Sequence, residues 1–198
     1  KDYYVHPKLG NDMNTGFSKN EAFKTLKRAE TINFKPGDRI LLAAGQTFIK
    51  GISLFNIHGS KVNPIKITSF PWETSHSLLK ATIDFKGETN GVLLEDCSFI
   101  EISNISLTGN GYLNDNPSQK MRCGILITSK NNKKTEHIRI KNITVFDVFF
   151  ENYGFTRGEN EIRTANGTQK YGWGIRIINK NPNNIINNIT IETCDIKN

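Results

Sequence analysis

One pattern occurs three times in the sequence, in Phe99-Ile-Glu-Ile-Ser-Asn-Ile-Ser-Leu107, His137-Ile-Arg-Ile-Lys-Asn-Ile-Thr-Val145 and Asn183-Asn-Ile-Ile-Asn-Asn-Ile-Thr-Ile191. Apolar and polar residues alternate in each stretch, and this period of two is typical of a β-strand. In each stretch the alternation is interrupted by an asparagine that is followed by isoleucine. We therefore expect three copies of one unit, with equivalent positions at Asn104, Asn142 and Asn188.

A second short strand precedes each copy and begins with a glycine: Gly91-Val-Leu-Leu, Gly124-Ile-Leu-Ile and Gly174-Ile-Arg-Ile. The two sets of strands stay in step along the chain, while the segments between them differ in length. This is typical of a solenoid, in which coils stack through parallel pairing and only the loops are free to grow. Asparagine suits the sharp turns, because it tolerates the left-handed backbone conformation and its amide can hydrogen-bond to the next coil. The repeats predict an all-β solenoid.

The residues before the repeats predict a cap for one end of this solenoid. Asn20 is a suitable N-cap for a helix over about residues 21–32, whose apolar residues recur at helical spacing. Such a helix can cover the core and the unpaired strand edge. We expect a single domain, residues 1–198, with the cap in residues 1–38 and the coils in 39–198. No second cap precedes Asn198, which predicts an N-terminal fragment of a longer protein, truncated at its C-terminal end, or another module at this end.

The composition indicates a globular protein and gives no support for a membrane-spanning or nucleic-acid-binding protein. Hydrophobic residues make up 36% of the chain, enough for a core, and no apolar run approaches the roughly 20 residues that span a bilayer. The net charge of +7 attracts polyanions in general, but no nucleic-acid recognition motif is present. We expect neither nucleic-acid binding nor membrane insertion, and the oligomeric state stays open. The three cysteines lack disulfide or metal spacing and are interpreted as small core or turn residues: Cys97, Cys123 and Cys194.

Segments near the N-terminus resemble the entry of the pectate-lyase-like right-handed parallel β-helix superfamily: Asp2-Tyr-Tyr-Val-His-Pro with Gly10-Asn-Asp12, Ala22-Phe-Lys-Thr-Leu26, and Lys35-Pro-Gly-Asp-Arg-Ile-Leu-Leu-Ala43. The repeats resemble the coils of this superfamily. The resemblance implies three strands in each coil, called PB1, PB2 and PB3, with the asparagine turn between PB2 and PB3. It also implies a polysaccharide lyase or glycoside hydrolase that is secreted, periplasmic or at the cell surface, with its signal peptide already absent from this numbering.

In this superfamily a sugar chain binds along the PB1 face, between the long connections that lead from PB3 to the next PB1. The register assigns PB1 strands to residues 91–94, 123–127 and 173–177, and these connections to residues 110–122 and 150–172. Strand alternation turns Leu93, Leu126 and Arg176 outward. It turns the intervening residues inward: Val92, Leu94, Ile125, Ile127, Ile175 and Ile177.

Arg176 is a catalytic candidate on this face. Its guanidinium could pair with a substrate carboxylate in a forked geometry, or act as the base or charge stabiliser of a β-elimination as the resemblance to family lyases implies. The alternative is a solvated surface arginine.

The two long connections and the strand after them supply the other candidates. Aromatic and charged side chains suit sugar binding, and the candidates of this kind are Tyr112, Asp115, Lys120, Arg122, Tyr153, Tyr171 and Trp173. A carboxylate pair could perform glycoside hydrolysis and would come from Glu151, Glu159 and Glu161. Arginine with a tyrosine could instead perform elimination, using Arg157 or Arg163. Salt bridges that serve solubility are the alternative for the longer connection. No cofactor is firmly implied, although Asn114-Asp-Asn116 could supply oxygen ligands to calcium.

Two functions of different classes remain. The leading hypothesis is a polysaccharide-degrading lyase or glycoside hydrolase that acts on an acidic glycan, because arginine and lysine occur in the connections beside PB1. The second is a noncatalytic carbohydrate-binding or adhesive β-helix module. The sequence does not decide between lyase and hydrolase or identify the sugar, and the catalytic residues could lie beyond Asn198.

Overall fold

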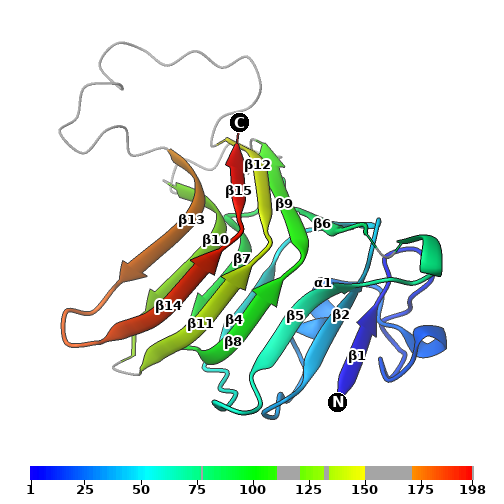
Figure 1. Cartoon of the computed structure of the whole chain (residues 1–198), viewed down its shortest axis with the longest axis horizontal. Helices are drawn as coiled ribbons and strands as arrows, with labels where there is room; N and C mark the ends of the chain where they lie inside the picture. The colour runs from blue at the N-terminus through cyan, green and yellow to red at the C-terminus, as the bar shows by residue number, and fades with distance from the viewer. Residues whose placement is uncertain (77, 111–120, 132–133, 150–170, 198) are drawn as a thin grey trace.

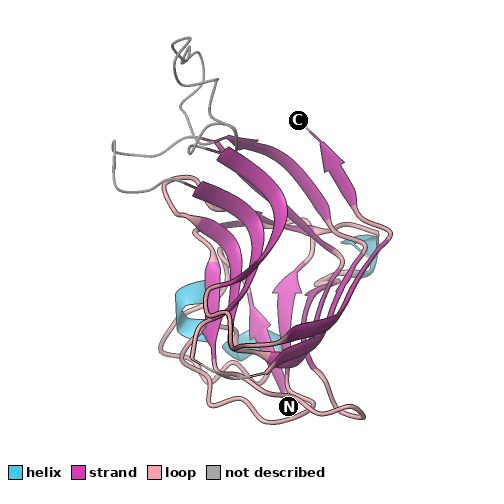
Figure 2. Ribbon diagram, turned by 90° about the vertical axis from the view of Figure 1, so that its left-hand side faces the viewer, coloured by secondary structure: helices cyan, strands magenta, loops and turns pink. Residues whose placement is uncertain are grey.

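The computed structural model describes residues 1–76, 78–110, 121–131, 134–149 and 171–197. All strand pairs in these residues are parallel and belong to three sheets. The predicted right-handed parallel β-helix is confirmed, and each coil passes through the PB1, PB2 and PB3 sheets in this order. Figure 1 shows the strands of the PB2 sheet side by side from β1 to β14, and Figure 2 shows strands curving around a common interior.

The three sheets have the following strands. The PB1 sheet contains β4 (Ile52–Phe55), β7 (Asn90–Glu95), β10 (Met121–Ser129) and β13 (Tyr171–Asn179). The PB2 sheet contains β1 (Asp2–Val5), β2 (Arg39–Ala43), β5 (Ile65–Phe70), β8 (Ser98–Ser103), β11 (Thr135–Lys141) and β14 (Ile186–Glu192). The PB3 sheet contains β3 (Thr47–Ile49), β6 (Ala81–Asp84), β9 (Ile105–Asn110), β12 (Thr144–Phe149) and β15 (Asp195–Lys197).

Columns of like apolar side chains fill the interior. In the PB2 sheet Ile67, Ile102 and Ile140 pair in register on successive coils, and all three are fully buried. Parallel pairing without a register shift places equivalent residues above one another, so the alternation in the sequence becomes a stacked core. β-Branched residues suit this arrangement because they pack well on a pleated surface.

The asparagine turn is confirmed in two copies and wrong in the third. Asn104 and Asn142 have left-handed φ values of 57° and 51°, and Asn142 Nδ2 donates to Asn104 Oδ1 at 2.8 Å. Asn188 lies inside β14, at the level of His137 on β11. The third turn residue is Thr193, whose Oγ1 accepts from Asn142 N and whose φ is 50°. Asn188 and Asn142 both begin the motif Asn-Ile-Thr. Because of this similarity, the third turn was predicted at Asn188, five residues before its actual position at Thr193.

The N-terminal helix is shorter than predicted. A single turn, α1 (Leu26–Ala29), forms after the N-cap Thr25, and a 3₁₀ turn, η1 (Lys19–Glu21), precedes it. The chain between them is extended because Phe23 forms a parallel bridge with Val5 of β1. A second 3₁₀ turn, η2 (Thr74–His76), follows β5.

This short helix still covers a strand edge. β4 is the outermost strand of the PB1 sheet, and its Ser53 N donates to the carboxylate of Glu30, the C-cap of α1, at 2.7 Å. In the middle of a sheet a neighbouring strand would accept this hydrogen bond from Ser53 N. Here the Glu30 side chain accepts it and takes the place of that strand. The cap therefore ends the sheet at the entry of the β-helix.

The cysteines occupy core and turn positions, as expected, and two of the three are buried. Cys97 and Cys123 are fully buried, and burial raises the pKa of each thiol to about 12. Cys194 is half-buried, and all three are free thiols. Reactive thiols have lowered pKa values and access to solvent, so Cys97 and Cys123 are inert packing residues.

A buried carboxylate joins the turns between the PB1 and PB2 sheets of successive coils. Asp96 accepts hydrogen bonds from Lys130 N at 2.8 Å and from Asn131 Nδ2 at 2.9 Å, with Ser129 Oγ at 3.3 Å. Burial would raise the pKa of Asp96, but these donors outweigh it and hold the pKa below its usual value. The ionised carboxylate therefore stabilises the stack of coils.

Acidification is expected to weaken the fold through Asp96. Its folded pKa lies below the value of about 3.9 for an unfolded aspartate. The stabilisation is therefore present above the unfolded pKa and is lost as the pH falls through the folded pKa. Asp96→Asn removes the titrating group and retains a residue that tolerates the φ of 56°. Urea unfolding of this variant should show a shallower loss of stability between about pH 5 and pH 2 than the native protein. Equal slopes would exclude Asp96 as a major contributor.

Candidate functional site

The outer face of the PB1 sheet carries one row of side chains from coil to coil. Ser53, Leu93, Leu126 and Arg176 pair in register on β4, β7, β10 and β13. The inward residues are fully buried at Val92, Leu94, Ile125 and Ile127, whereas Ile175 is partly buried and Ile177 is 43% exposed on the edge strand β13. Leu126 is only 3% exposed although it belongs to the outer row. The row thus leads from a serine beside the cap to an arginine on β13.

The structure brings two predicted site residues together at the β13 end of this row. The guanidinium carbon of Arg176 lies 4.6 Å from the centroid of the Trp173 ring, and the indole is 36% exposed. A cation over an aromatic face is attracted to it, and the planar guanidinium is well suited to such stacking. Arg176 is half-buried, so the contact restricts the side chain before any ligand arrives. We call this pair the Trp173–Arg176 stack.

Arg122 does not lie on the outer face as a substrate-binding side chain would. It is fully buried, its Nη2 donates to Phe85 O at 2.9 Å, and its Nε donates to Glu88 O at 3.1 Å. The guanidinium also lies over the Phe85 ring, 5.2 Å from its centroid. The prediction that Arg122 binds substrate is therefore wrong. Its side chain has a structural role, because the two carbonyl groups and the Phe85 ring hold it inside the fold. Arg122 braces the turn that leads from β6 into β7.

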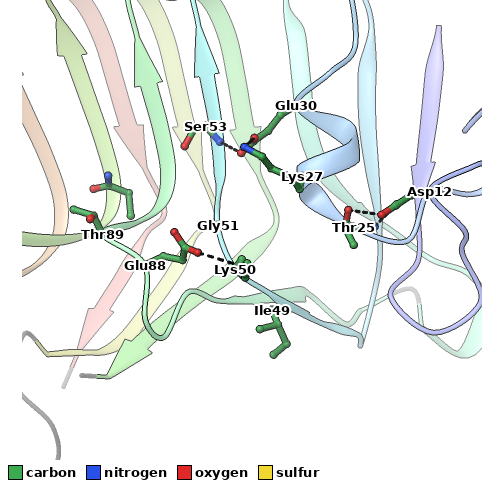
Figure 3. A pocket seen from close by; sticks show the side chains of 11 residues that line it. Asp12, Thr25, Lys27, Glu30, Ile49, Lys50, Gly51, Ser53, Glu88 and Thr89 are labelled. Carbon is green, nitrogen blue, oxygen red and sulfur yellow. Dashed lines mark hydrogen bonds and ion pairs between the residues drawn. The ribbon is translucent and has the colours of Figure 1, made fainter. Parts of the chain in front are cut away.

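A groove of about 660 Å³ lies at the other end of the outer row, between the cap and the starts of β4 and β7. Figure 3 shows its side chains, which come from four separate segments of the chain. We call it the cap groove, and its lining consists of Asp12, Thr25, Lys27, Glu30, Ile49, Lys50, Gly51, Ser53, Glu88, Thr89 and Asn90. Because Ser53 belongs both to this lining and to the outer row, the groove opens onto the PB1 face.

Two carboxylates fix the cap side of the groove. Asp12 accepts from Lys24 N, Thr25 N and Thr25 Oγ1 at 2.7–2.9 Å. Burial would raise the pKa of Asp12, but these hydrogen bonds outweigh it and lower the pKa. Glu30 binds Ser53 N and, at 2.6 Å, Lys27 Nζ. These carboxylates therefore hold the cap side of the groove in shape.

The coil side of the groove is less constrained. Lys50 Nζ and Glu88 Oε1 are 3.9 Å apart, and their side chains are 70% and 45% exposed. Asn90 Oδ1 is buried and accepts no hydrogen bond from the residues that the structure describes. These groups could bind the hydroxyl groups of a ligand. The sequence analysis missed them, although their position just before the glycines at 51 and 91, where each PB1 strand begins, was a usable signal.

The other predicted site residues lie outside the described residues: Tyr112, Asp115, Lys120, Glu151, Tyr153, Arg157, Glu159, Glu161 and Arg163, with the calcium candidate at Asn114–Asn116. Tyr171 begins β13, but its side chain is also outside what is described. Among residues 1–76, 78–110, 121–131, 134–149 and 171–197, no three His, Cys, Asp or Glu side chains form a metal-binding group. None of the helices in these ranges is long and apolar enough to cross a membrane.

The fold and the outer row of side chains together define the class of protein. It is a three-sheet parallel β-helix whose outer PB1 face runs from the cap groove to the Trp173–Arg176 stack. No family model matches the chain, and no curated protein matches it. Two solved structures of a GH136 lacto-N-biosidase from Eubacterium ramulus, native and selenomethionine-substituted, are similar to 99% of the chain with a TM-score of 0.72 and 21% identity. A rhamnogalacturonan lyase is similar to 98% of it with a TM-score of 0.52 and 14% identity.

These similarities are to the fold. The chain spans 34% of the length of the lacto-N-biosidase and 56% of that of the lyase. Both neighbours carry the names of carbohydrate-active enzymes, and at these identities a shared fold does not transfer an activity.

Proposed function

We propose that this chain belongs to a carbohydrate-active enzyme, a lyase or glycoside hydrolase, that binds an acidic polysaccharide along the outer face of the PB1 sheet. The observation that carries the proposal is the Trp173–Arg176 stack, which presents an aromatic ring and a fixed guanidinium at one end of the outer row. Aromatic rings with a few placed polar groups are typical of ligand sites. The fold, shared with a lacto-N-biosidase and a rhamnogalacturonan lyase, supports the same class.

Arg176 would pair with a carboxylate of the substrate. A guanidinium binds a carboxylate through two parallel N–H donors, and its charge stabilises the negative charge that develops when a proton is removed next to a carboxylate. This would serve elimination directly. In hydrolysis Arg176 would anchor the sugar, while two carboxylates performed the acid and base steps. A substrate of this kind also leads us to propose a secreted, periplasmic or cell-surface location.

A noncatalytic glycan-binding module is the second candidate. It is favoured by the composition of the outer row itself, in which Ser53, Leu93, Leu126 and Arg176 include no carboxylate. Such a row could bind a glycan through stacking and one ion pair, with no group for acid–base chemistry.

Activity on a panel of acidic and neutral polysaccharides tests the proposal, with reducing ends and the ultraviolet absorbance of unsaturated products as readouts. Arg176→Ala should lower kcat/KM on the preferred acidic glycan by about 30-fold or more, because one partner of a desolvated charge pair is lost. Arg139→Ala is the matched control, since Arg139 forms an ion pair with Glu192 on the outer PB2 face. Binding without turnover would support the module instead, and neither binding nor turnover on any glycan would exclude both functions.

A further inference from the structure

We propose that the cap groove is a second subsite for the same glycan and that it takes a neutral sugar unit. This inference rests on the proposed function and adds the composition of the substrate: a heteroglycan whose acidic unit lies at the Trp173–Arg176 stack and whose neutral unit lies at the cap.

The register of the PB1 sheet sets the distance between the two ends. Ser53 and Arg176 are separated by two intervening strands, so three inter-strand spacings of about 4.8 Å give a span of about 14 Å. A chain that runs along the axis of the β-helix crosses Leu93 and Leu126 on its way. Leu93 is partly exposed and can contact the face of an intermediate sugar ring, whereas Leu126 is 3% exposed and lies beneath the surface that the chain would follow. An extended oligosaccharide can therefore reach both ends, whereas a single sugar cannot.

The charges of the cap groove differ from those at Arg176. The lining combines three carboxylates with two ammonium groups, from Asp12, Glu30, Glu88, Lys27 and Lys50. Both ammonium groups already pair with carboxylates, Lys27 with Glu30 and Lys50 with Glu88, so a uronic acid carboxylate would meet a lining with an excess of negative charge, and like charges oppose binding. Hydroxyl groups, in contrast, can donate to carboxylates and accept from ammonium groups. The groove therefore selects a neutral unit.

The coil side of the groove offers hydrogen-bond acceptors that a sugar hydroxyl would satisfy. Asn90 Oδ1 accepts no hydrogen bond in the described structure, and a buried acceptor without a donor is costly. Among the described residues the Glu88 carboxylate forms one long, exposed ion pair, with Lys50, which a ligand can replace at little cost. A hydroxyl donor that enters the groove could bind either group.

Arg122 is a positioning residue for this subsite. Its guanidinium binds the carbonyl oxygens of Phe85 and Glu88, which belong to the turn that carries Glu88, Thr89 and Asn90 into the groove. The buried Arg122 side chain thus holds this turn on the coil side of the groove. Asp12 and Glu30 hold the opposite wall, on the cap side. A subsite with both walls fixed loses little conformational freedom on binding.

Calorimetric titration with two sets of oligosaccharides of equal length tests the inference. One set alternates neutral and uronic-acid units, and the other consists of uronic acids alone. The native protein should bind the alternating set more tightly. Glu88→Gln and Asn90→Ala should each lower the affinity for this set about tenfold, as expected for a lost hydrogen bond to a charged or buried group, and should affect the uronic-acid set much less. Both variants should fold, because Glu88 is exposed and Asn90 Oδ1 has no hydrogen-bond partner to lose among the residues that the structure describes.

Glu101→Gln provides the matched control, because Glu101 pairs with Lys66 at 3.6 Å on the outer PB2 face. Arg176→Ala should weaken both sets of oligosaccharides. If Arg176→Ala weakens binding while the Glu88 and Asn90 variants bind as the native protein does, the subsite is wrong and the proposed function stands. If the native protein binds neither set, the proposed function fails and the subsite fails with it.

Discussion

Gly124→Ala is expected to destabilise the protein by about 3 kcal/mol or more. A Cβ at this position would lie 2.6 Å from Gly174 O on the next coil and 2.8 Å from Val145 Cγ1. The same geometry recurs one coil earlier, where a Cβ on Gly91 would lie 2.7 Å from Gly124 O. A backbone carbonyl cannot move away without separating the coils, so the clash has no inexpensive relief. Urea unfolding of the native and variant proteins measures the effect.

Gly37→Ala is the control, because Gly37 is needed for its left-handed backbone conformation and not for a close approach between coils. Gly37 has a φ of 88°, but its nearest neighbour would be 3.5 Å from an added Cβ. This variant should lose only about 1 kcal/mol, the cost of a left-handed conformation. If Gly124→Ala unfolds within about 0.5 kcal/mol of the native protein, the close approach of the coils at this glycine is wrong.

Arg122→Ala is expected to cost about 3–5 kcal/mol. It removes the guanidinium donor from Phe85 O and Glu88 O, of which Phe85 O keeps its hydrogen bond from Glu88 N, and it removes the packing of the guanidinium on the Phe85 ring. Lysine has one point charge in place of a planar fork, so Arg122→Lys should recover only part of the loss. The midpoint of urea unfolding is the appropriate measurement.

Arg139→Ala is the control that separates the effect of losing a buried arginine from the effect of losing a positive charge. Arg139 is exposed and pairs with Glu192 at the surface, where such pairs contribute at most about 1 kcal/mol. Similar losses for Arg122→Ala and Arg139→Ala would contradict the internal brace that we assign to Arg122.

The repeats predicted the architecture because they encode geometry directly. A glycine at or near the start of each PB1 strand and an asparagine at two of the turns between PB2 and PB3 mark places where coils approach closely or the chain bends sharply, as at Gly124 and Asn142. Asn188 shows the limit of this approach: two positions of one coil adopt left-handed φ, and the sequence motif alone did not identify which of them was the turn.

The candidate site was less predictable for two physical reasons. Strand alternation identified the outer row, but it did not anticipate the Trp173–Arg176 stack, because residues three positions apart on one strand are expected on opposite faces. The burial of Arg122 depends on carbonyl groups of Phe85 and Glu88, more than thirty positions earlier in the chain. The cap groove likewise forms only when coil stacking brings four distant segments together. The predicted helix over residues 21–32 failed because the bridge from Phe23 to β1 outweighed the local helical pattern.

The central claim is that one glycan lies along the outer face of the PB1 sheet, from the Trp173–Arg176 stack to the cap groove. Calorimetric titration of the native protein with a length series of the alternating oligosaccharides tests it most directly. We predict that affinity rises with each added unit until the ligand spans the row of about 14 Å, and then levels off. An affinity that is independent of length, or that is already complete with a single sugar, would contradict the claim.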